Sequence, residues 1–281
     1  MPRTPVPPLV LAFAGADPTC GAGLQADLLT LAALGCHPLT VATALTVQDT
    51  AGVAGFDAVA PDRVEEQART LLADMSVAVF KVGMMASVAN VAAIAAVIAD
   101  HPDIPVVLDP VLASGRGEEL SDGDIVAALR DLLLPRTTVL TPNSVEARRL
   151  ARAEPDADLG HCALELLGTG CEYVLATGTH EDTAQVINSL YGQVDGGPAG
   201  ASVGLVRSDA WPRLPGSYHG SGCTLASALA ALLARGLNPL AAAHAAQEFT
   251  WQSLAAGFQP GMGQFIPDRM FASRDRIAGT H

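Results

Sequence analysis

The sequence predicts an α/β protein with a mostly parallel central sheet, helices on both faces of that sheet and a small β excursion. Short apolar runs alternate with longer segments of helical periodicity, which is typical of parallel strands joined by right-handed helical crossovers. The strand candidates are apolar throughout, as expected for strands covered on both faces. Hydrophobic residues make up 49% of the 281 residues and charged residues 16%, so the chain holds ample material for a large core.

Each predicted strand is a short apolar run, and each predicted helix is a longer stretch with apolar residues at helical spacing. The predicted strands are Leu9–Ala14, Leu39–Thr46, Val77–Val82, Val106–Leu108, Thr138–Leu140 and Tyr173–Ala176. The predicted helices are Ala22–Leu34, Asp62–Asp74, Val88–Ala99, Asp124–Leu134, Ser144–Arg152, Cys162–Leu167, Thr224–Arg235 and Pro239–Ala255. Two segments break the alternation and are predicted as extended hairpin or edge pieces, Ala51–Val59 and Ala184–Val206. No linker, repeat or charge block divides the chain, so we expect a single domain over residues 1–281.

The charge balance excludes several classes of partner. The formal net charge is −13, which argues against nucleic acid or an anionic membrane surface. A phosphate-bearing small molecule is still compatible, because backbone amides and a metal ion can bind phosphate. The chain has one lysine, Lys81, and Val82 follows it, so a phosphate-binding loop with Gly-Lys-Ser/Thr is excluded. Any Schiff-base mechanism would have to use Lys81.

The cysteines and the apolar stretches predict a soluble cytoplasmic protein. Five cysteines, an odd number, are scattered without a Cys-x-x-Cys motif, which favours free thiols in a reducing compartment. The proline-rich opening and the short apolar run after it do not resemble a signal peptide. Two stretches without charged residues, Leu28–Gln48 and Val82–Ala99, contain glycine and polar residues and are predicted as buried elements, not membrane spans.

Polar residues follow every predicted strand. In an open parallel sheet, ligands bind beyond the carboxyl ends of the strands, so these residues are expected to border one cleft. In strand order they are Gly15-Ala16-Asp17, Gln48-Asp49, Gly83-Met84, Asp109-Pro110, Thr141-Pro142-Asn143 and Thr177-Gly178. Together they predict a polar cleft with carboxylate, amide and glycine groups along one edge of the sheet.

The most informative string is Gly220-Ser221-Gly222-Cys223-Thr224, which opens the apolar helix Thr224–Arg235. The first amides of a buried helix need a partner, and glycines let the backbone approach an anion closely. The alternative is that Ser221 is only an N-cap. Cys223 stands where the helix dipole should lower the pKa of a thiol, so it is a candidate to accept a proton from a substrate hydroxyl; the alternative is a small buried filler.

Three acidic residues are candidates for the same site. Asp27 lies on an apolar helix face, where a carboxylate is costly unless it is hydrogen-bonded. A substrate could donate that hydrogen bond; the alternatives are a bond from a neighbouring backbone amide or a position at the exposed edge of the face. Asn143 and Glu146 have the spacing of a capping box, which is the favoured reading for that pair alone. The functional alternative makes Glu146 and Asp109 oxygen ligands of a magnesium ion, with waters between.

Two weaker patterns are present in the chain. Gly21–Ala26 matches the dinucleotide fingerprint G-x-G-x-x-A, which leaves an NAD-dependent oxidoreductase as a remote alternative. The segment starts too far from Gly15 for the tight turn of that motif, and no clearly placed ribose-binding acid follows. The seven histidines show no zinc spacing and are expected to be structural.

A set of motifs, in order and at plausible spacing, carries a resemblance to a known family. The motifs are Ala14–Pro18, Gly21–Leu28, Ala44–Thr50, Lys81–Met84, Leu108–Val111, Leu140–Ala147 and His219–Thr224. With them the chain resembles the hydroxymethylpyrimidine/phosphomethylpyrimidine kinases of thiamine biosynthesis, within the ribokinase-like superfamily. The likeness runs from about Leu9 to about Phe258.

The resemblance implies a three-layer ribokinase-like fold, ATP and Mg2+ as cofactors, and a homodimer. It implies phosphorylation of 4-amino-5-hydroxymethyl-2-methylpyrimidine and then of its monophosphate. The implied pyrimidine site is Gly15, Asp27, Gln48, Met84 and Val111. The Gly220–Cys223 loop, with Gly220, Ser221 and Gly222, matches the family's anion hole, and Cys223 stands where sugar kinases carry a catalytic Asp. Asp109, Asn143 and Glu146 match the magnesium and phosphate positions.

One departure concerns the ATP phosphates. The family usually carries Lys-Gly-Gly-His after the sixth strand, whereas this chain has Thr177 in a segment without lysine, and the loop at Thr19–Gly23 is also altered. We hypothesise that Arg116 supplies the missing charge and that Thr177 borders the nucleotide. Two alternatives for function stay open here: a pyridoxal-type vitamin kinase and a pyrimidine-binding protein that has lost turnover.

Overall fold

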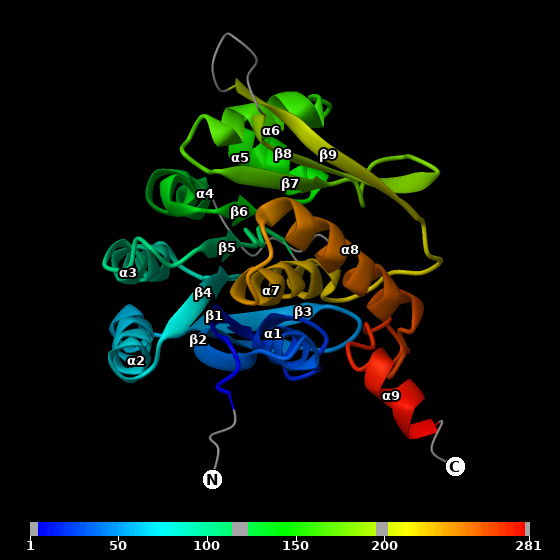
Figure 1. Cartoon of the computed structure of the whole chain (residues 1–281), viewed down its shortest axis with the longest axis horizontal. Coiled ribbons are helices and arrows are strands. Elements are labelled where there is room, and N and C mark those ends of the chain that lie inside the picture. Colours follow the sequence, from blue (N-terminus) through cyan, green and yellow to red (C-terminus); the bar gives the residue numbers. More distant parts are fainter. Residues whose placement is uncertain (1–4, 114–122, 195–201, 279–281) are drawn as a thin grey trace.

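The computed structural model describes residues 5–113, 123–194 and 202–278. Its centre is a nine-stranded sheet with the strand order β3-β2-β1-β4-β5-β6-β7-β8-β9 (Figure 1). The strands are β1 (Leu9–Ala16), β2 (His37–Gln48), β3 (Val53–Ala58), β4 (Val77–Val82), β5 (Val106–Leu108), β6 (Val139–Leu140), β7 (Tyr173–Thr177), β8 (Gln185–Val194) and β9 (Ser202–Pro212). The predicted α/β class is confirmed.

Helices cover both faces of this sheet (Figure 1). The helices are α1 (Gly23–Ala33), α2 (Pro61–Asp74), α3 (Val88–Ala99), α4 (Gly123–Ala128), α5 (Ser144–Ala151), α6 (Leu159–Leu167), α7 (Ser221–Ala234), α8 (Pro239–Ala255) and α9 (Phe271–Ala278). One apolar cluster joins the sheet to α2 through α6, and a second joins its other face to α1, α7 and α8. This double cover explains why the central strands consist of continuous apolar runs.

The six central strands, from β2 to β7 in sheet order, are parallel, and β3, β8 and β9 add antiparallel edges. The chain passes from β1 to β2 on one side and later to β4 on the other side of β1, which is a topological switch point. The carboxyl ends of the parallel strands therefore meet at one edge of the sheet, where a ligand cleft is expected.

Most predicted elements agree with the structure within two or three residues, and β4, β5, α3 and α8 have the predicted bounds. Three predictions need correction. The helix predicted for Asp124–Leu134 is only partly α-helical, because a π-helical turn over Leu129–Leu133 follows α4 and Pro135 cannot continue a helix. α7 begins at Ser221 and not at Thr224. The segment predicted as Ala184–Val206 forms two long strands that extend to Pro212, and the turn predicted around Gly196–Pro198 lies outside the described residues.

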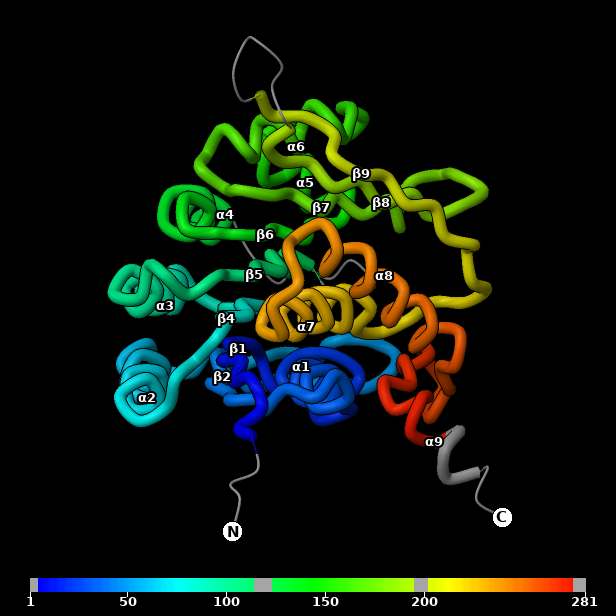
Figure 2. Tube along the Cα trace, in the orientation of Figure 1, coloured from blue at the N-terminus to red at the C-terminus, as the bar shows by residue number. Residues whose placement is uncertain are grey.

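The end of the chain was not predicted to be structured. After α8 the chain turns back towards α1, and α9 follows at the margin of the molecule (Figure 2). Its apolar pattern is weak, which explains why periodicity did not identify it. Within the described residues, no helix combines the length and the apolar character needed to cross a bilayer.

Candidate active site

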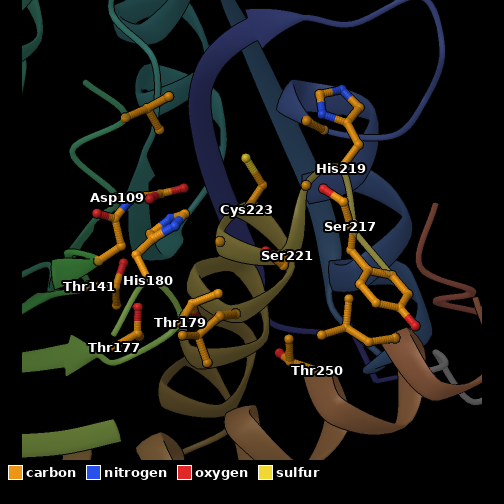
Figure 3. Close-up of a pocket in the computed structure, with 18 of the residues that line it drawn as sticks. Asp109, Thr141, Thr177, Thr179, His180, Ser217, His219, Ser221, Cys223 and Thr250 are labelled. Atoms are coloured by element: carbon orange, nitrogen blue, oxygen red, sulfur yellow. The ribbon is translucent and has the colours of Figure 1, made fainter. Parts of the chain in front are cut away.

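A cavity of about 530 Å3 opens at the carboxyl ends of the parallel strands. Figure 3 shows the amino end of α7 in it, with the Cys223 sulfur pointing into the space between Asp109 and His219. The predicted site residues that line the cavity are Gly15, Gln48, Met84, Asp109, Val111, Asn143, Glu146, Thr177, Gly220, Ser221, Gly222 and Cys223. Asp27 is not among the lining residues, and Arg116 lies outside the described residues.

The amino end of α7 is shaped by Gly220. Its φ is +79°, and a Cβ there would lie 1.9 Å from the carbonyl oxygen of Gly21, so only glycine fits. Gly220 is the N-cap, so the alternative that Ser221 caps the helix is wrong. In the described part of the chain, no group accepts a hydrogen bond from the backbone N–H of Ser221, Gly222 or Cys223. Three free amides at a helix start facing a cavity favour an anionic ligand.

The pKa of Cys223 differs from the prediction. Burial is the main reason that the pKa of this half-buried thiol is raised to about 12, and the nearby carboxylates Asp109 and Asp27 contribute in the same direction. The ammonium of Lys81 lowers the pKa of Cys223, but its effect is smaller than that of burial. The predicted lowering by the helix dipole is therefore wrong, because desolvation beside carboxylates outweighs the helix end.

Asp109 follows β5 and faces α7. It is 4% exposed, its Oδ2 has no hydrogen-bond partner in the described structure, and a Cβ on Gly222 would lie 3.7 Å from its Oδ1. Burial raises the pKa of Asp109 to about 6, although Lys81 lowers it. An orphaned buried carboxylate oxygen beside a cavity is costly without a partner, which indicates that a donor or a cation completes the site.

Glu146 caps α5 and also lines the cavity. The capping box is confirmed: Asn143 Oδ1 accepts from the Glu146 N–H at 2.9 Å, and Glu146 Oε2 accepts from the Asn143 N–H at 3.0 Å. Its other oxygen accepts from the Leu112 N–H at 3.2 Å, and the side chain also lines the cavity. Burial, followed by the charge of Asp109, raises the pKa of Glu146 to about 7.

The donor set fits Mg2+ better than a transition metal. Two buried carboxylates, Asp109 and Glu146, border the same cavity, and Mg2+ uses one or two carboxylates while water and phosphate oxygens complete its shell. Among the described residues, no group of three or more His, Cys, Asp or Glu side chains is placed to hold a metal ion. A zinc-type site is therefore not formed in that part of the chain.

Replacing Asp109 by Asn is expected to stabilise the metal-free protein at pH 8. The pKa of Asp109 is higher in the folded chain than in the unfolded one, because burial favours the protonated carboxyl. Its favourable contribution to the free energy of unfolding is therefore fully present below about pH 4 and is lost as the pH rises through about 6. Asp109→Asn should then raise the free energy of unfolding by on the order of 2 kcal/mol at pH 8. Urea unfolding in EDTA at pH 8 and pH 5 measures this. A gain of the same size at pH 5 would contradict the electrostatic origin.

Asp27 does not line the cavity and has internal partners. It is completely buried, and its carboxylate pairs with the Lys81 ammonium at 2.8 Å and accepts from Ser227 Oγ at 2.7 Å. Lys81 is also completely buried, and although burial alone would lower the pKa of Lys81, Asp27 holds it above its usual value. Internal partners therefore satisfy the Asp27 carboxylate behind the cavity in this structure, and its contact with substrate stays a prediction. The same pairing removes Lys81 as a Schiff-base candidate.

Breaking this ion pair is expected to destabilise the protein strongly. Lys81→Met leaves the Asp27 charge buried without its partner, which should lower the free energy of unfolding by about 3–5 kcal/mol. The double variant Asp27→Asn/Lys81→Met removes both charges and keeps an acceptor for Ser227, so it should recover part of the loss. Urea unfolding followed by circular dichroism provides the comparison, and a double variant no more stable than Lys81→Met would refute this explanation.

The structure adds a buried His–Asp pair that the sequence analysis did not identify. His219 Nε2 lies 2.9 Å from Asp17 Oδ2, and both residues line the cavity. Burial alone would raise the pKa of Asp17, but hydrogen bonds from His219 and from the Thr19 and Ala22 amides hold it below its usual value. Because the Ala22 N–H already donates to Asp17, the glycine segment there does not offer that amide to a dinucleotide.

The outer wall of the cavity was also missed. It contains both tryptophans of the chain, Trp211 and Trp251, whose rings stack with centroids 6.4 Å apart. Thr250 and Leu254 of α8 lie on the same wall. Trp211 is on the edge strand β9 and Trp251 on α8, so only the folded chain brings them together. In the sequence, the only indication of this wall was that tryptophan is rare in the chain, with two residues.

Comparison with known proteins agrees with this geometry. The family model described as phosphomethylpyrimidine kinase matches residues 17–268. The chain belongs to this family. A hydroxymethylpyrimidine/phosphomethylpyrimidine kinase of Streptomyces coelicolor is 39% identical over 268 residues, which cover 93% of this chain and 94% of the relative. Membership in this kinase family shows that the protein is an ATP-dependent kinase.

Two solved structures show the same fold. A Bacillus subtilis pyridoxal kinase in complex with ADP has a TM-score of 0.82 at 26% identity, covering 95% of this chain and 99% of that one. A phosphomethylpyrimidine kinase from Clostridium difficile has a TM-score of 0.72 at 27% identity, covering 88% of this chain and 99% of that one. The predicted ribokinase-like fold and the family resemblance are confirmed.

Proposed function

We propose that this protein uses ATP to phosphorylate 4-amino-5-hydroxymethyl-2-methylpyrimidine and then the resulting monophosphate, as the names of its relatives describe. One observation of the site supports this most directly. Three free amides at the start of α7 and the orphaned Oδ2 of Asp109 border one cavity. The amides suit a transferring phosphoryl group, and the carboxylate suits the cation that accompanies it.

The inner part of the cavity suits a neutral aminopyrimidine ring. Met84 and Val111 provide apolar contacts, and a Cβ on Gly15 would lie 3.2 Å from the Met84 sulfur, so glycine leaves room for a flat ring. Gln48 donates from Nε2 to Thr46 at 2.7 Å, which orients its amide to hydrogen-bond a ring substituent. These groups would place the hydroxymethyl arm towards the start of α7.

Phosphoryl transfer depends on in-line positioning and charge stabilisation more than on covalent chemistry. The amides of Ser221, Gly222 and Cys223 would hold the transferring group. Asp109 and Glu146 would hold Mg2+, which would neutralise phosphate charge when bound. Cys223 is the group that would accept the proton of the substrate hydroxyl at Sγ as the new O–P bond forms, and it would do so from its thiolate form, which is a small fraction near neutral pH because its pKa is raised.

The nucleotide would occupy the outer part of the cavity. Asn143 and Thr177 are adjacent through an isolated β-bridge and both line it, next to the wall that carries Trp251 and Thr250. Thr177 offers a hydroxyl where the family usually offers a lysine, so the phosphate charge must be balanced elsewhere. The Arg116 hypothesis stays a prediction, because that residue lies outside the described part of the chain.

A pyridoxal-type kinase is the second candidate, and one observation favours it. The match to the pyridoxal kinase has the higher TM-score, 0.82 against 0.72 for the phosphomethylpyrimidine kinase. Both substrates are aromatic rings with a hydroxymethyl arm, so the cavity described above suits either. The family model and the curated relative favour the pyrimidine.

The deciding experiment incubates the protein with ATP and Mg2+ and either the hydroxymethylpyrimidine or pyridoxal, and follows ADP and the products by mass spectrometry. We expect ADP, pyrimidine monophosphate and then diphosphate to form, with slower turnover of pyridoxal. Faster turnover of pyridoxal would favour the second candidate. Pyrimidine binding without ADP release would indicate a protein that has lost turnover, and binding of NAD(H) without any effect of ATP would indicate an oxidoreductase. The homodimer and the cytoplasmic location stay predictions.

A further inference from the structure

Arg269 is a buried cation next to the candidate phosphate site. It follows α8 in the chain, is 2% exposed and stands just beyond residues 17–268, which the family model matches. Its neighbours hold it firmly. The Asp268 N–H donates to Ser253 O on α8 at 2.9 Å, and the His219 N–H donates to Phe265 O at 2.8 Å. The segment that carries Arg269 is thus joined to the residue that precedes Gly220.

The guanidinium of Arg269 binds only neutral oxygens. Its Nε donates to Thr224 Oγ1 at 3.0 Å, and its two terminal nitrogens donate to Cys20 O at 3.2 Å, Gly21 O at 2.5 Å and Gly220 O at 3.4 Å. Among the described side chains, no carboxylate forms an ion pair with it. Burial lowers the pKa of Arg269, and the carboxylates of Asp27 and Asp17, which form no ion pair with it, offset only part of that lowering. A buried cation held in this way is stabilised further when an anion binds nearby.

These bonds also orient the free amides at the start of α7. Gly220 O accepts from the N–H and the Oγ1 of Thr224, at 3.0 and 2.8 Å, and from Arg269. In a trans peptide the next N–H points in the opposite direction to the carbonyl. Fixing the Gly220 carbonyl therefore fixes the Ser221 N–H, and Ser221 lines the cavity.

The other charged residues near the cavity provide little positive charge for a phosphate ligand. Lys81, the single lysine of the chain, is neutralised by Asp27, and the cavity itself contains the carboxylates Asp109 and Glu146. Thr177 provides no charge. Arg269 is a buried cation that forms no ion pair with a carboxylate among the described residues, and it lies directly behind the loop that would hold phosphate.

We propose that Arg269 is a positioning residue of the phosphate site: it holds the Gly220–Cys223 loop against Cys20 and Gly21 and supplies positive charge for phosphate-bearing ligands. The inference rests on the proposed function, and it concerns binding of nucleotides and of the phosphorylated pyrimidine. It adds nothing to binding of the neutral pyrimidine alcohol. The distinction between charged and neutral ligands is what makes it testable.

The experiment compares Arg269→Gln and Arg269→Lys with the parent protein by calorimetry, using Mg-ADP and the neutral hydroxymethylpyrimidine as separate probes. We expect Arg269→Gln to weaken ADP binding about tenfold and to leave pyrimidine binding within about twofold. Arg269→Lys keeps the charge but not the several bonds, so ADP binding should stay within about threefold while kcat falls. The matched control is Arg235→Gln, because Arg235 bonds the Leu34 carbonyl at the opposite end of α7.

Each outcome is decisive. Unchanged ADP affinity in folded Arg269→Gln would overturn the proposal, and so would an equal loss for ADP and the pyrimidine, which indicates a general structural role. If Arg269→Gln does not fold, Arg269→Lys decides by kcat: a kcat equal to that of the parent would overturn the positioning role, and a lower kcat with ADP binding within about threefold would support it. A parent protein that binds ADP but phosphorylates neither precursor would refute the proposed function, while the ADP comparison would still test Arg269.

Discussion

Cys223→Ala is expected to lower kcat by about 100-fold or more while leaving the KM for the pyrimidine nearly unchanged, because positioned proton acceptors contribute about 10²–10⁴-fold. Cys223 stands at the start of α7 and lines the cavity with its sulfur between Asp109 and His219. Cys223→Asp should retain more activity, since a carboxylate can accept the hydroxyl proton at the same place. Steady-state kinetics with ATP and the hydroxymethylpyrimidine measures both variants.

The raised pKa of Cys223 makes this prediction sharper. With a pKa of about 12, the thiolate fraction rises tenfold for each pH unit through the neutral range. If the thiolate is the base, kcat of the parent should rise steadily from pH 7.5 to pH 9.5, and the rise should be absent in Cys223→Asp. A flat profile for the parent would show that the proton leaves by another route.

The control for this series is another cysteine that packs against α7. Cys36 is buried, and its sulfur contacts the carbonyl oxygen of Ala231 on α7 but does not line the cavity. Cys36→Ala should therefore keep kcat near that of the parent. If Cys223→Ala matched the parent as Cys36→Ala does, Cys223 would be a packing residue and not the base.

Asp109→Asn is expected to lower kcat by about 10³-fold, the second large effect. Its unpartnered Oδ2 faces the start of α7, so loss of the charge removes the proposed magnesium contact and the charge stabilisation that comes with it. The Mg2+ concentration needed for half-maximal activity should rise in the same variant. Kinetics over a Mg2+ titration, at saturating ATP, gives both quantities.

The matched control is Asp103→Asn. Asp103 is exposed and precedes β5, whereas Asp109 follows it, so the two residues stand at opposite edges of the sheet. Removing the Asp103 charge should change neither kcat nor the Mg2+ requirement. Equal kinetics for Asp109→Asn and Asp103→Asn would refute the role of Asp109, whereas the stability gain at pH 8 would be unaffected.

The central part of the fold could be predicted because its signals are local. Strands covered on both faces must be apolar at every position, so β4 and β5 had the predicted bounds. β9 was predicted too short because it is an edge strand, where exposed and partly buried residues alternate and the apolar run disappears. α9 carries little apolar pattern, so periodicity could not identify it.

In the candidate site, too, the features set by local motifs could be predicted and those set by contacts between distant segments could not. Gly220–Cys223, Asp109 and the capping box of Asn143 and Glu146 were predictable because each is a short motif next to a strand or helix end. The pairing of Asp27 with Lys81 was not, because the two residues are 54 positions apart and only the packing of α1 onto the face of the sheet that contains β4 brings them together. The Arg269 bond to Gly21 spans 248 positions for the same reason.

By itself, the sequence determined the class of fold, the order of the central strands and helices along the chain, and the short motifs that meet at the cavity. These depend on residue spacing and on local hydrogen bonds. Only the tertiary structure decided that Asp27 has an internal partner, that Arg269 stands behind the phosphate loop and that the pKa of Cys223 is raised. Those properties depend on desolvation and on contacts between distant segments, and neither exists until the chain is packed.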